Sequence, residues 1–113
     1  MSDFIAAYLK NNNSYTLKVL RNDLSNSGHV DSLTEQLKGV VNDTIEDGQI
    51  KDFILDMSEV GTVCSRVLSL FLVLRKIIDD NQGKFTLVLK SNSFVVEIIK
   101  IANLTKLFNI EIV

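Results

Sequence analysis

Two different spacings of apolar residues take turns along this chain. Runs in which apolar residues alternate with polar ones, or follow one another without a break, are typical of strands, whereas apolar residues three and four positions apart are typical of helices. Two strand-like runs come first, and helix-like and strand-like segments then alternate to the end. The predicted strands are residues 3–9, 15–20, 53–55, 85–89 and 110–113, and the predicted helices are residues 31–43, a segment that begins at Ser65 and is stopped by the polar residues 79–83, and residues 94–102.

Polar residues and glycines mark the connections between these segments. The asparagines at positions 11–13 predict a turn, so the first two strands should form a hairpin. Residues 21–29 are polar and contain Gly28, which predicts a loop. The dipeptide Asp47-Gly48 predicts a turn. Residues 56–64 read as irregular, and residues 104–108 as a short turn of helix.

Several side chains are placed to begin or end the predicted helices. Ser32 and Glu35 have the spacing of a capping box, with Asp31 as a second possible cap. Residues 91–93 should cap the third helix. Ser65 lies at the N-cap position of the second helix, where its hydroxyl could cap the first turn. Past the end of the second helix, Gly83 suits the left-handed backbone that closes many helices, and Asn103 should stop the third helix.

The order of elements, β-β-α-β-α-β-α-β, predicts the fold class. Alternating strands and helices imply right-handed crossovers and a mostly parallel sheet with helices packed against it, with the hairpin adding an antiparallel pair. The strand at residues 85–89 is apolar enough to be covered on both faces. A chain of 113 residues predicts one α/β domain spanning residues 1–113.

Composition narrows the possible partners. Twelve basic and fourteen acidic residues are mixed without a basic stripe, so we expect no nucleic-acid binding. The longest apolar run, residues 67–74, is interrupted by Ser69 and is far shorter than the roughly 20 residues that cross a bilayer, so direct membrane insertion is not expected. A single cysteine excludes an internal disulfide, and no apolar leader follows Met1. We therefore expect a cytoplasmic protein.

The sequence lacks the residues that most catalytic mechanisms require. One histidine, His29, and one cysteine, Cys64, cannot supply a zinc site, and no phosphate-binding glycine motif occurs, so we expect neither a metal nor a cofactor. A Cys64–His29 dyad in a small enzyme stays open as an alternative, although no third group stands out to orient it. A non-enzymatic binding module is the better interpretation.

The segment from residue 53 to residue 76 offers the candidate binding features. Ser65 follows a strand and a loop at the carboxyl end of the predicted sheet, where open α/β sheets place their working residues. A helix start also favours negative charge, so Ser65 is either a cap or a phosphorylation site. Leu68 and Leu72 fall outside the apolar stripe of the helix that faces the core. They predict a small partner-binding patch, unless neighbouring elements cover them.

From residue 51 to residue 112 the chain resembles the STAS domain, the fold of bacterial anti-sigma factor antagonists. The strand end Leu55-Asp56-Met57 matches the leucine–Asp–leucine of that family. Residues 64–69, Cys-Ser-Arg-Val-Leu-Ser, fall on its Asp-Ser-Ser-Gly-Leu-Gly motif, which opens a helix. The later strand, helix and closing pattern also fit, whereas the first half of the chain fits in element order only.

The resemblance implies a regulatory domain in a partner-switching system. In that family the unmodified antagonist binds an anti-sigma factor that is also a serine kinase; phosphorylation of the first motif serine, here Ser65, breaks the complex, and a phosphatase resets it. The implied partner surface contains Cys64, Ser65, Arg66, Leu68 and Leu72, and a dimer is possible. The motif aspartate is Cys64 here and the second serine is Arg66. These departures leave an alternative open, a non-phosphorylated STAS subunit of a larger assembly such as a lipid-transport ATPase complex or a signalling scaffold.

Overall fold

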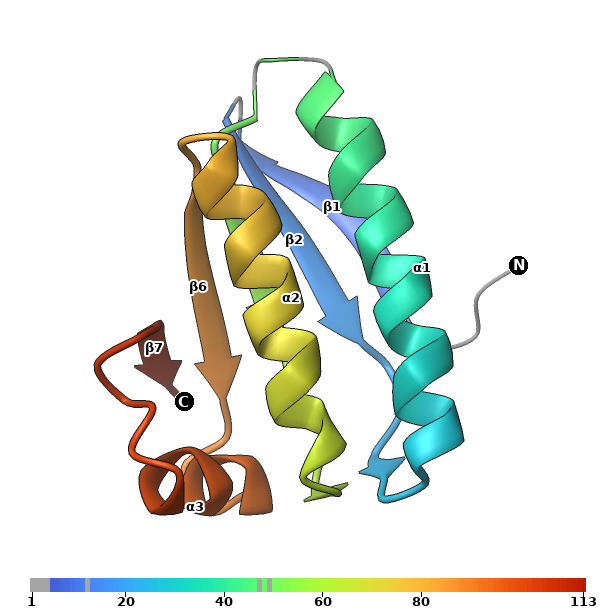
Figure 1. Ribbon diagram of the computed structural model, residues 1–113, viewed down its shortest axis with the longest axis vertical. Coiled ribbons are helices and arrows are strands. Elements are labelled where there is room, and N and C mark those ends of the chain that lie inside the picture. The colour runs from blue at the N-terminus through green and yellow to red at the C-terminus, as the bar shows by residue number, and fades with distance from the viewer. Residues whose placement is uncertain (1–4, 12, 47, 49) are drawn as a thin grey trace.

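The chain forms a sheet with two long helices on one side (Figure 1). The computed structural model describes residues 5–11, 13–46, 48 and 50–113 and, of residues 8–11, the backbone alone. The elements are β1 (Ile5–Asn11), β2 (Ser14–Val19), β3 (Asp23–Leu24), α1 (Ser27–Glu46), β4 (Asp52–Asp56), β5 (Thr62–Val63), α2 (Arg66–Asp80), β6 (Lys84–Leu89), α3 (Phe94–Ile101) and β7 (Asn109–Ile112).

The main sheet has the strand order β1-β2-β4-β6-β7. β1 and β2 pair antiparallel, as the predicted hairpin requires, and every other pair in this sheet is parallel. The two-residue strands β3 and β5 form a second, parallel pair. Without that pair, the order of elements is β-β-α-β-α-β-α-β, so the predicted α/β class with a mixed, mostly parallel sheet is confirmed.

Both long helices lie on the same face of the sheet because of the strand order (Figure 1). From β2 to β4 to β6, each parallel step moves one position in the same direction across the sheet. Right-handed crossovers that all step in one direction carry their helices over the same face. α1 and α2 therefore pack side by side, and their starts point to the edge where β2, β4 and β6 end.

The core lies between these helices and the sheet. Leu17, Leu55 and Leu87 sit opposite one another on three adjacent strands, and all three are fully buried. Phe71 of α2 meets Phe108 edge-on, with ring centroids 6.0 Å apart, which seals the side near β7. Along β6 buried residues alternate with half-buried ones, so the prediction that this strand is covered on both faces is wrong: among the described residues both long helices lie over the other face.

α1 is longer than its apolar stripe predicted. It begins at Ser27 rather than at residue 31, and its cap is Asn26, whose Oδ1 accepts a hydrogen bond from the N–H of His29 at 3.2 Å. Ser32 lies inside the helix, so the predicted capping box at its start is wrong. The first turn is polar and mostly exposed, and such a turn adds nothing to an apolar period.

The two predicted loops at residues 21–29 and 56–64 contain regular structure. β3 and β5 lie in them, paired through residues almost forty positions apart. Of the predicted turn before β4, Asp47 lies outside the described residues, and Gly48 has the left-handed φ of 75° that such a turn uses. Residues 104–108 form a turn rather than a piece of helix.

Two helix ends close with left-handed residues, although one of them is not the predicted residue. After α2 the left-handed position belongs to Gln82, with φ 61°, and the prediction for Gly83 is wrong. Gly83 is needed for space, because a Cβ there would lie 2.8 Å from the carbonyl oxygen of Lys51. Asn103, with φ 58°, ends α3 as predicted. In both cases two backbone hydrogen bonds close the turn in the Schellman pattern.

Candidate functional site

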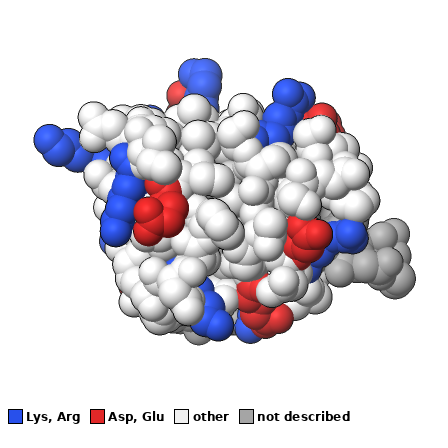
Figure 2. Space-filling model, turned by 90° about the horizontal axis from the view of Figure 1, so that it is seen from below, with Lys and Arg blue, Asp and Glu red and all other residues white. Residues whose placement is uncertain are grey.

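The candidate site lies at the edge where the parallel strands β2, β4 and β6 end. The starts of α1, α2 and α3 gather there (Figure 1). Figure 2 views the molecule from this end, and its charged side chains stand mainly around the rim of a broad uncharged area. Open α/β sheets place their ligands and partners at this edge. All five candidate residues belong to α2 or to the two positions before it.

Ser65 occupies the N-cap position of α2, but its hydroxyl does not cap the helix. The backbone of Ser65 is already helical, with φ −62° and ψ −17°, and its side chain makes no cap hydrogen bond. Capping serines normally have extended backbone, which directs the side-chain oxygen back to the N–H groups of the first turn. The predicted cap is therefore wrong, and the exposed side chain of Ser65 is held by no such bond.

Cys64 is half-buried and packs against the edge of the core. Its backbone N–H donates to the carbonyl oxygen of Leu24 at 3.1 Å, which extends the pairing of β3 with β5. The position that holds an aspartate in the STAS motif is thus occupied by a side chain turned partly inward. His29, the other half of the conceivable dyad, lies in the first turn of α1 rather than in a loop.

Arg66 joins α2 to α1. Its Nε donates to Oδ1 of Asp31 at 2.8 Å, and its Nη2 donates to Oδ2 at 3.3 Å, in the two-pronged geometry that arginine makes with carboxylates. The two side chains are 56% and 53% exposed, so water screens the pair, and its contribution to stability is at most about 1 kcal/mol. Arg66 is therefore engaged by a neighbouring helix.

The two candidate leucines differ in burial. Leu72 is 41% exposed on the outer side of α2. Leu68, one turn earlier, is half-buried and packs against the core. The predicted patch therefore rests mainly on Leu72, because Leu68 is partly covered.

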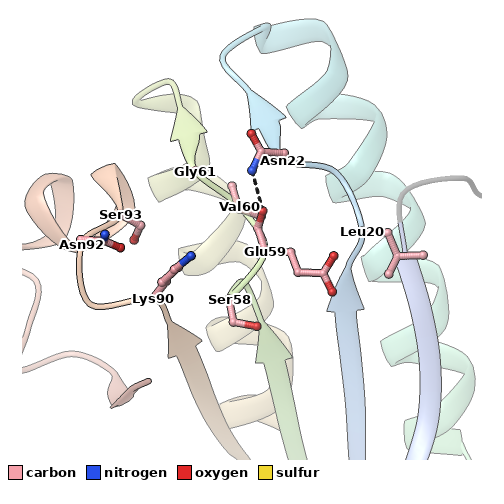
Figure 3. A pocket seen from close by; sticks show the side chains of 9 residues that line it. All are labelled: Leu20, Asn22, Ser58, Glu59, Val60, Gly61, Lys90, Asn92 and Ser93. Carbon is pink, nitrogen blue, oxygen red and sulfur yellow. Dashed lines mark hydrogen bonds between the residues drawn. The ribbon is translucent and has the colours of Figure 1, made fainter.

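A second feature of this end is a hollow that no sequence pattern above predicted. It has a volume of about 410 Å³ and lies between the segments that follow β2, β4 and β6 (Figure 3). Its lining residues are Leu20, Asn22, Ser58, Glu59, Val60, Gly61, Lys90, Asn92 and Ser93. The available signal was a run of polar residues directly after a buried parallel strand, at residues 90–93.

Asn22 holds one wall of the hollow in place. Its carbonyl oxygen accepts hydrogen bonds from the N–H groups of Gly61 and Thr62, at 2.8 and 3.2 Å. Its side-chain Nδ2 donates to the carbonyl oxygen of Glu59 at 3.1 Å (Figure 3). Three bonds from one residue thus tie the segment after β4 to the segment after β2.

Asp23, the next residue, has an ordered carboxylate. The hydroxyl of Ser25 and its backbone N–H, the latter at 2.9 Å, both donate to this group and hold the pKa of Asp23 below its ordinary value. A carboxylate whose folded pKa is lowered stabilises the fold above its unfolded pKa and loses that contribution as the pH falls through the folded pKa. Because the group is fully exposed, this contribution is small.

Comparison with known proteins adds no family assignment. No protein-family model matches the chain, and no curated protein matches it either. Among the described residues, no helix is both long and apolar enough to cross a membrane. In the same part of the chain, no three histidine, cysteine, aspartate or glutamate side chains are grouped so that they could hold a metal ion.

Proposed function

We propose that this chain is a regulatory protein-binding domain similar to the STAS anti-sigma factor antagonists, with Ser65 as its phosphorylation site. The observation that carries the proposal is the state of the Ser65 side chain. It is exposed at the start of α2, two residues after β5, and its hydroxyl makes no cap hydrogen bond. A kinase would therefore break no helix cap in order to reach it.

The surroundings support a protein as the partner. The broad uncharged area at this end of the molecule suits a protein surface better than a nucleic acid (Figure 2). The exposed Leu72 offers an apolar contact on the adjoining side of α2. The partner we expect is an anti-sigma factor with serine kinase activity, met in the cytoplasm, with a phosphatase that reverses the modification.

A phosphate on Ser65 would act through charge. It would bring about −1.5 to −2 charges at pH 7 to the amino end of α2, where the helix dipole favours negative charge, so the fold would remain intact. A partner that covers Ser65 would have to strip the water from this charge, which is costly. Phosphorylation would therefore release the partner without unfolding the domain.

The alternative is a non-phosphorylated STAS subunit of a larger assembly. The observation that favours it is the pair between Arg66 and Asp31. A phosphate on Ser65 would have to compete for this arginine with a carboxylate that already holds it at 2.8 Å. In this alternative the same end of the molecule binds its partner permanently.

Mass spectrometry separates the two functions. The chain is isolated from its own host in growth and in starvation, its intact mass is measured, and fragmentation locates any phosphate. We expect one phosphate on Ser65, absent from Ser65→Ala and retained in Ser69→Ala, a matched variant at an exposed serine of the same helix. A chain that stays unmodified in all conditions would favour the permanent subunit.

Binding to the captured partner tests the surface. We expect Ser65→Asp and Leu72→Asp each to weaken binding about tenfold or more, the loss typical of a central contact. The control is Ile101→Asp, since Ile101 is 84% exposed on a different helix and should bind normally. Equal binding by all three folded variants would exclude this face of α2 as the partner surface.

A further inference from the structure

Ser93 carries a polar atom that the fold leaves without a partner. The residue is 5% exposed, and its Oγ is buried and forms no hydrogen bond. It precedes α3 with extended backbone, φ −87° and ψ 156°, which is the usual conformation of a capping residue, yet its side chain makes no cap bond. A buried hydroxyl without a partner is costly, so it calls for an explanation.

This hydroxyl lies on the wall of the hollow between the ends of β4 and β6. Figure 3 shows the Ser93 hydroxyl beside the Asn92 amide, with the Lys90 ammonium across the same space. The first turn of α3 follows Ser93 directly, and its N–H groups have no intrahelical partner and no side-chain cap from Ser93. Hydroxyl, amide, ammonium and backbone N–H groups are all hydrogen-bond donors.

The charges around the hollow favour an anion. Within the described residues Lys90 takes part in none of the ion pairs, so its positive charge is available. The one carboxylate in the lining, Glu59, points away from Lys90 (Figure 3) and is neutralised by Lys18 at 2.8 Å. Glu97, the acidic residue in the first turn of α3, is not part of the lining. The hollow therefore combines a helix start with an uncompensated cation.

We propose that this hollow binds the phosphoryl group of a small phosphate ester. Three phosphoryl oxygens can accept from the Ser93 hydroxyl, the Asn92 amide, the Lys90 ammonium and the first N–H groups of α3, whereas a carboxylate has only two oxygens for these donors. A volume of about 410 Å³ exceeds what a phosphate ion fills, and the apolar side chains of Leu20 and Val60 border the remainder. The organic part of the ester extends toward Leu20, whose side chain is exposed, because Val60 is buried.

The test is a titration of the full chain, followed through its backbone amides by nuclear magnetic resonance. Inorganic phosphate is added at constant ionic strength, with sulfate and chloride in parallel and with glycerol phosphate as the simplest ester. We expect saturable shifts in the amides of residues 93–96, with glycerol phosphate binding tighter than inorganic phosphate. Shifts that chloride produces equally, or saturable shifts only elsewhere in the chain, would overturn the proposal.

Variants separate a binding role for Ser93 from a structural one. Ser93→Ala and Lys90→Gln should each weaken phosphate binding about tenfold, the loss expected for one charge-assisted hydrogen bond. Ser91→Ala and Lys84→Gln are the matched controls, because Ser91 is an exposed neighbour and Lys84 stands at the opposite end of β6; both should bind normally. Lys90 is exposed, so Lys90→Gln decides the matter if Ser93→Ala does not fold. Unchanged binding by a folded Lys90→Gln would refute the site.

This proposal is independent of the switch at Ser65. Ser65 does not line the hollow, so Ser65→Ala should bind phosphate as the unaltered chain does. Phosphate binding by a chain that is never phosphorylated would support this site and exclude the proposed switch. Phosphorylation of Ser65 in a chain that does not bind phosphate would support the switch and exclude this site.

Discussion

The starts of α2 and α3 look alike in sequence and differ in structure. Each helix follows a serine at the N-cap position, and neither serine caps its helix. Ser65 has helical backbone and an exposed side chain, whereas Ser93 has extended backbone and a buried hydroxyl without a partner. One hydroxyl is thus accessible to an enzyme, and the other is enclosed at the wall of a hollow.

The difference teaches that a cap requires both backbone conformation and side-chain direction. At Ser65 the conformation is unsuitable, and at Ser93 it is suitable but the hydroxyl is not used. The start of α1 supplies the reference, since Asn26 has a side-chain oxygen that accepts the N–H of His29. Comparing the three helix starts by mutation distinguishes a cap, an exposed site and an enclosed site.

The largest expected contrast comes from enlarging each serine. Ser93→Leu places a bulky side chain at a residue that is only 5% exposed. Overpacking of this kind costs about 1–3 kcal/mol of unfolding free energy. Ser65→Leu at an exposed position should stay within about 0.5 kcal/mol of the unaltered chain. Urea denaturation of both variants measures the difference. Equal losses at the two positions would mean that the burial difference is not real.

Removing the true cap should have the next largest effect. Asn26→Ala deletes the acceptor for the His29 N–H and should lower the free energy of unfolding by about 1 kcal/mol. The same urea titration measures it, with Asn42→Ala, at an exposed position in the interior of α1, as the control for side-chain loss away from the cap. A loss no larger than that of the control would show that Asn26 does not cap α1.

Ser93→Ala should change stability in the opposite direction. Removing a buried hydroxyl without a partner relieves a desolvation penalty, so without added phosphate we expect a gain of up to about 1 kcal/mol. Thermal and urea unfolding both report its sign. A loss similar to that of Asn26→Ala would mean that Ser93 is an ordinary cap in solution.

The smallest effect is expected at Ser65. Ser65→Ala removes an exposed hydroxyl that makes no cap bond, so the free energy of unfolding should change by less than about 0.5 kcal/mol. A loss near 1 kcal/mol in urea denaturation would restore Ser65 as a cap and would weaken the argument for an accessible hydroxyl.

The main sheet could be predicted because its elements are long enough to show a period. Residues 53–55 and 85–89 stood out as buried strands, and they are the centre of the observed sheet. β3 and β5 have two residues each, too few for any period, and what holds them is pairing between Leu24 and Val63. The start of α1 was missed because its first turn is polar.

Part of the candidate site could be predicted from the sequence. Ser65 could be found from a local pattern, a strand followed by a loop and a helix start. The ion pair between Arg66 and Asp31 could not be predicted from a local pattern, because those residues are 35 positions apart and meet only when α1 and α2 pack. The hollow likewise brings together Val60, which follows β4, and Ser93, which follows β6. No local sequence pattern predicts that these residues line one hollow.

The three hydrogen bonds of Asn22 have a consequence for motion. They fix the segment that leads from β4 into β5 at Glu59, Gly61 and Thr62, although this segment lies outside the main sheet. Amide hydrogens in surface loops usually exchange with solvent within the fastest opening events of a protein. The amides of Gly61 and Thr62 should instead exchange slowly and together, because both are released only when the clamp opens. The segment that leads into Ser65 would then open as one cooperative unit with the wall of the hollow.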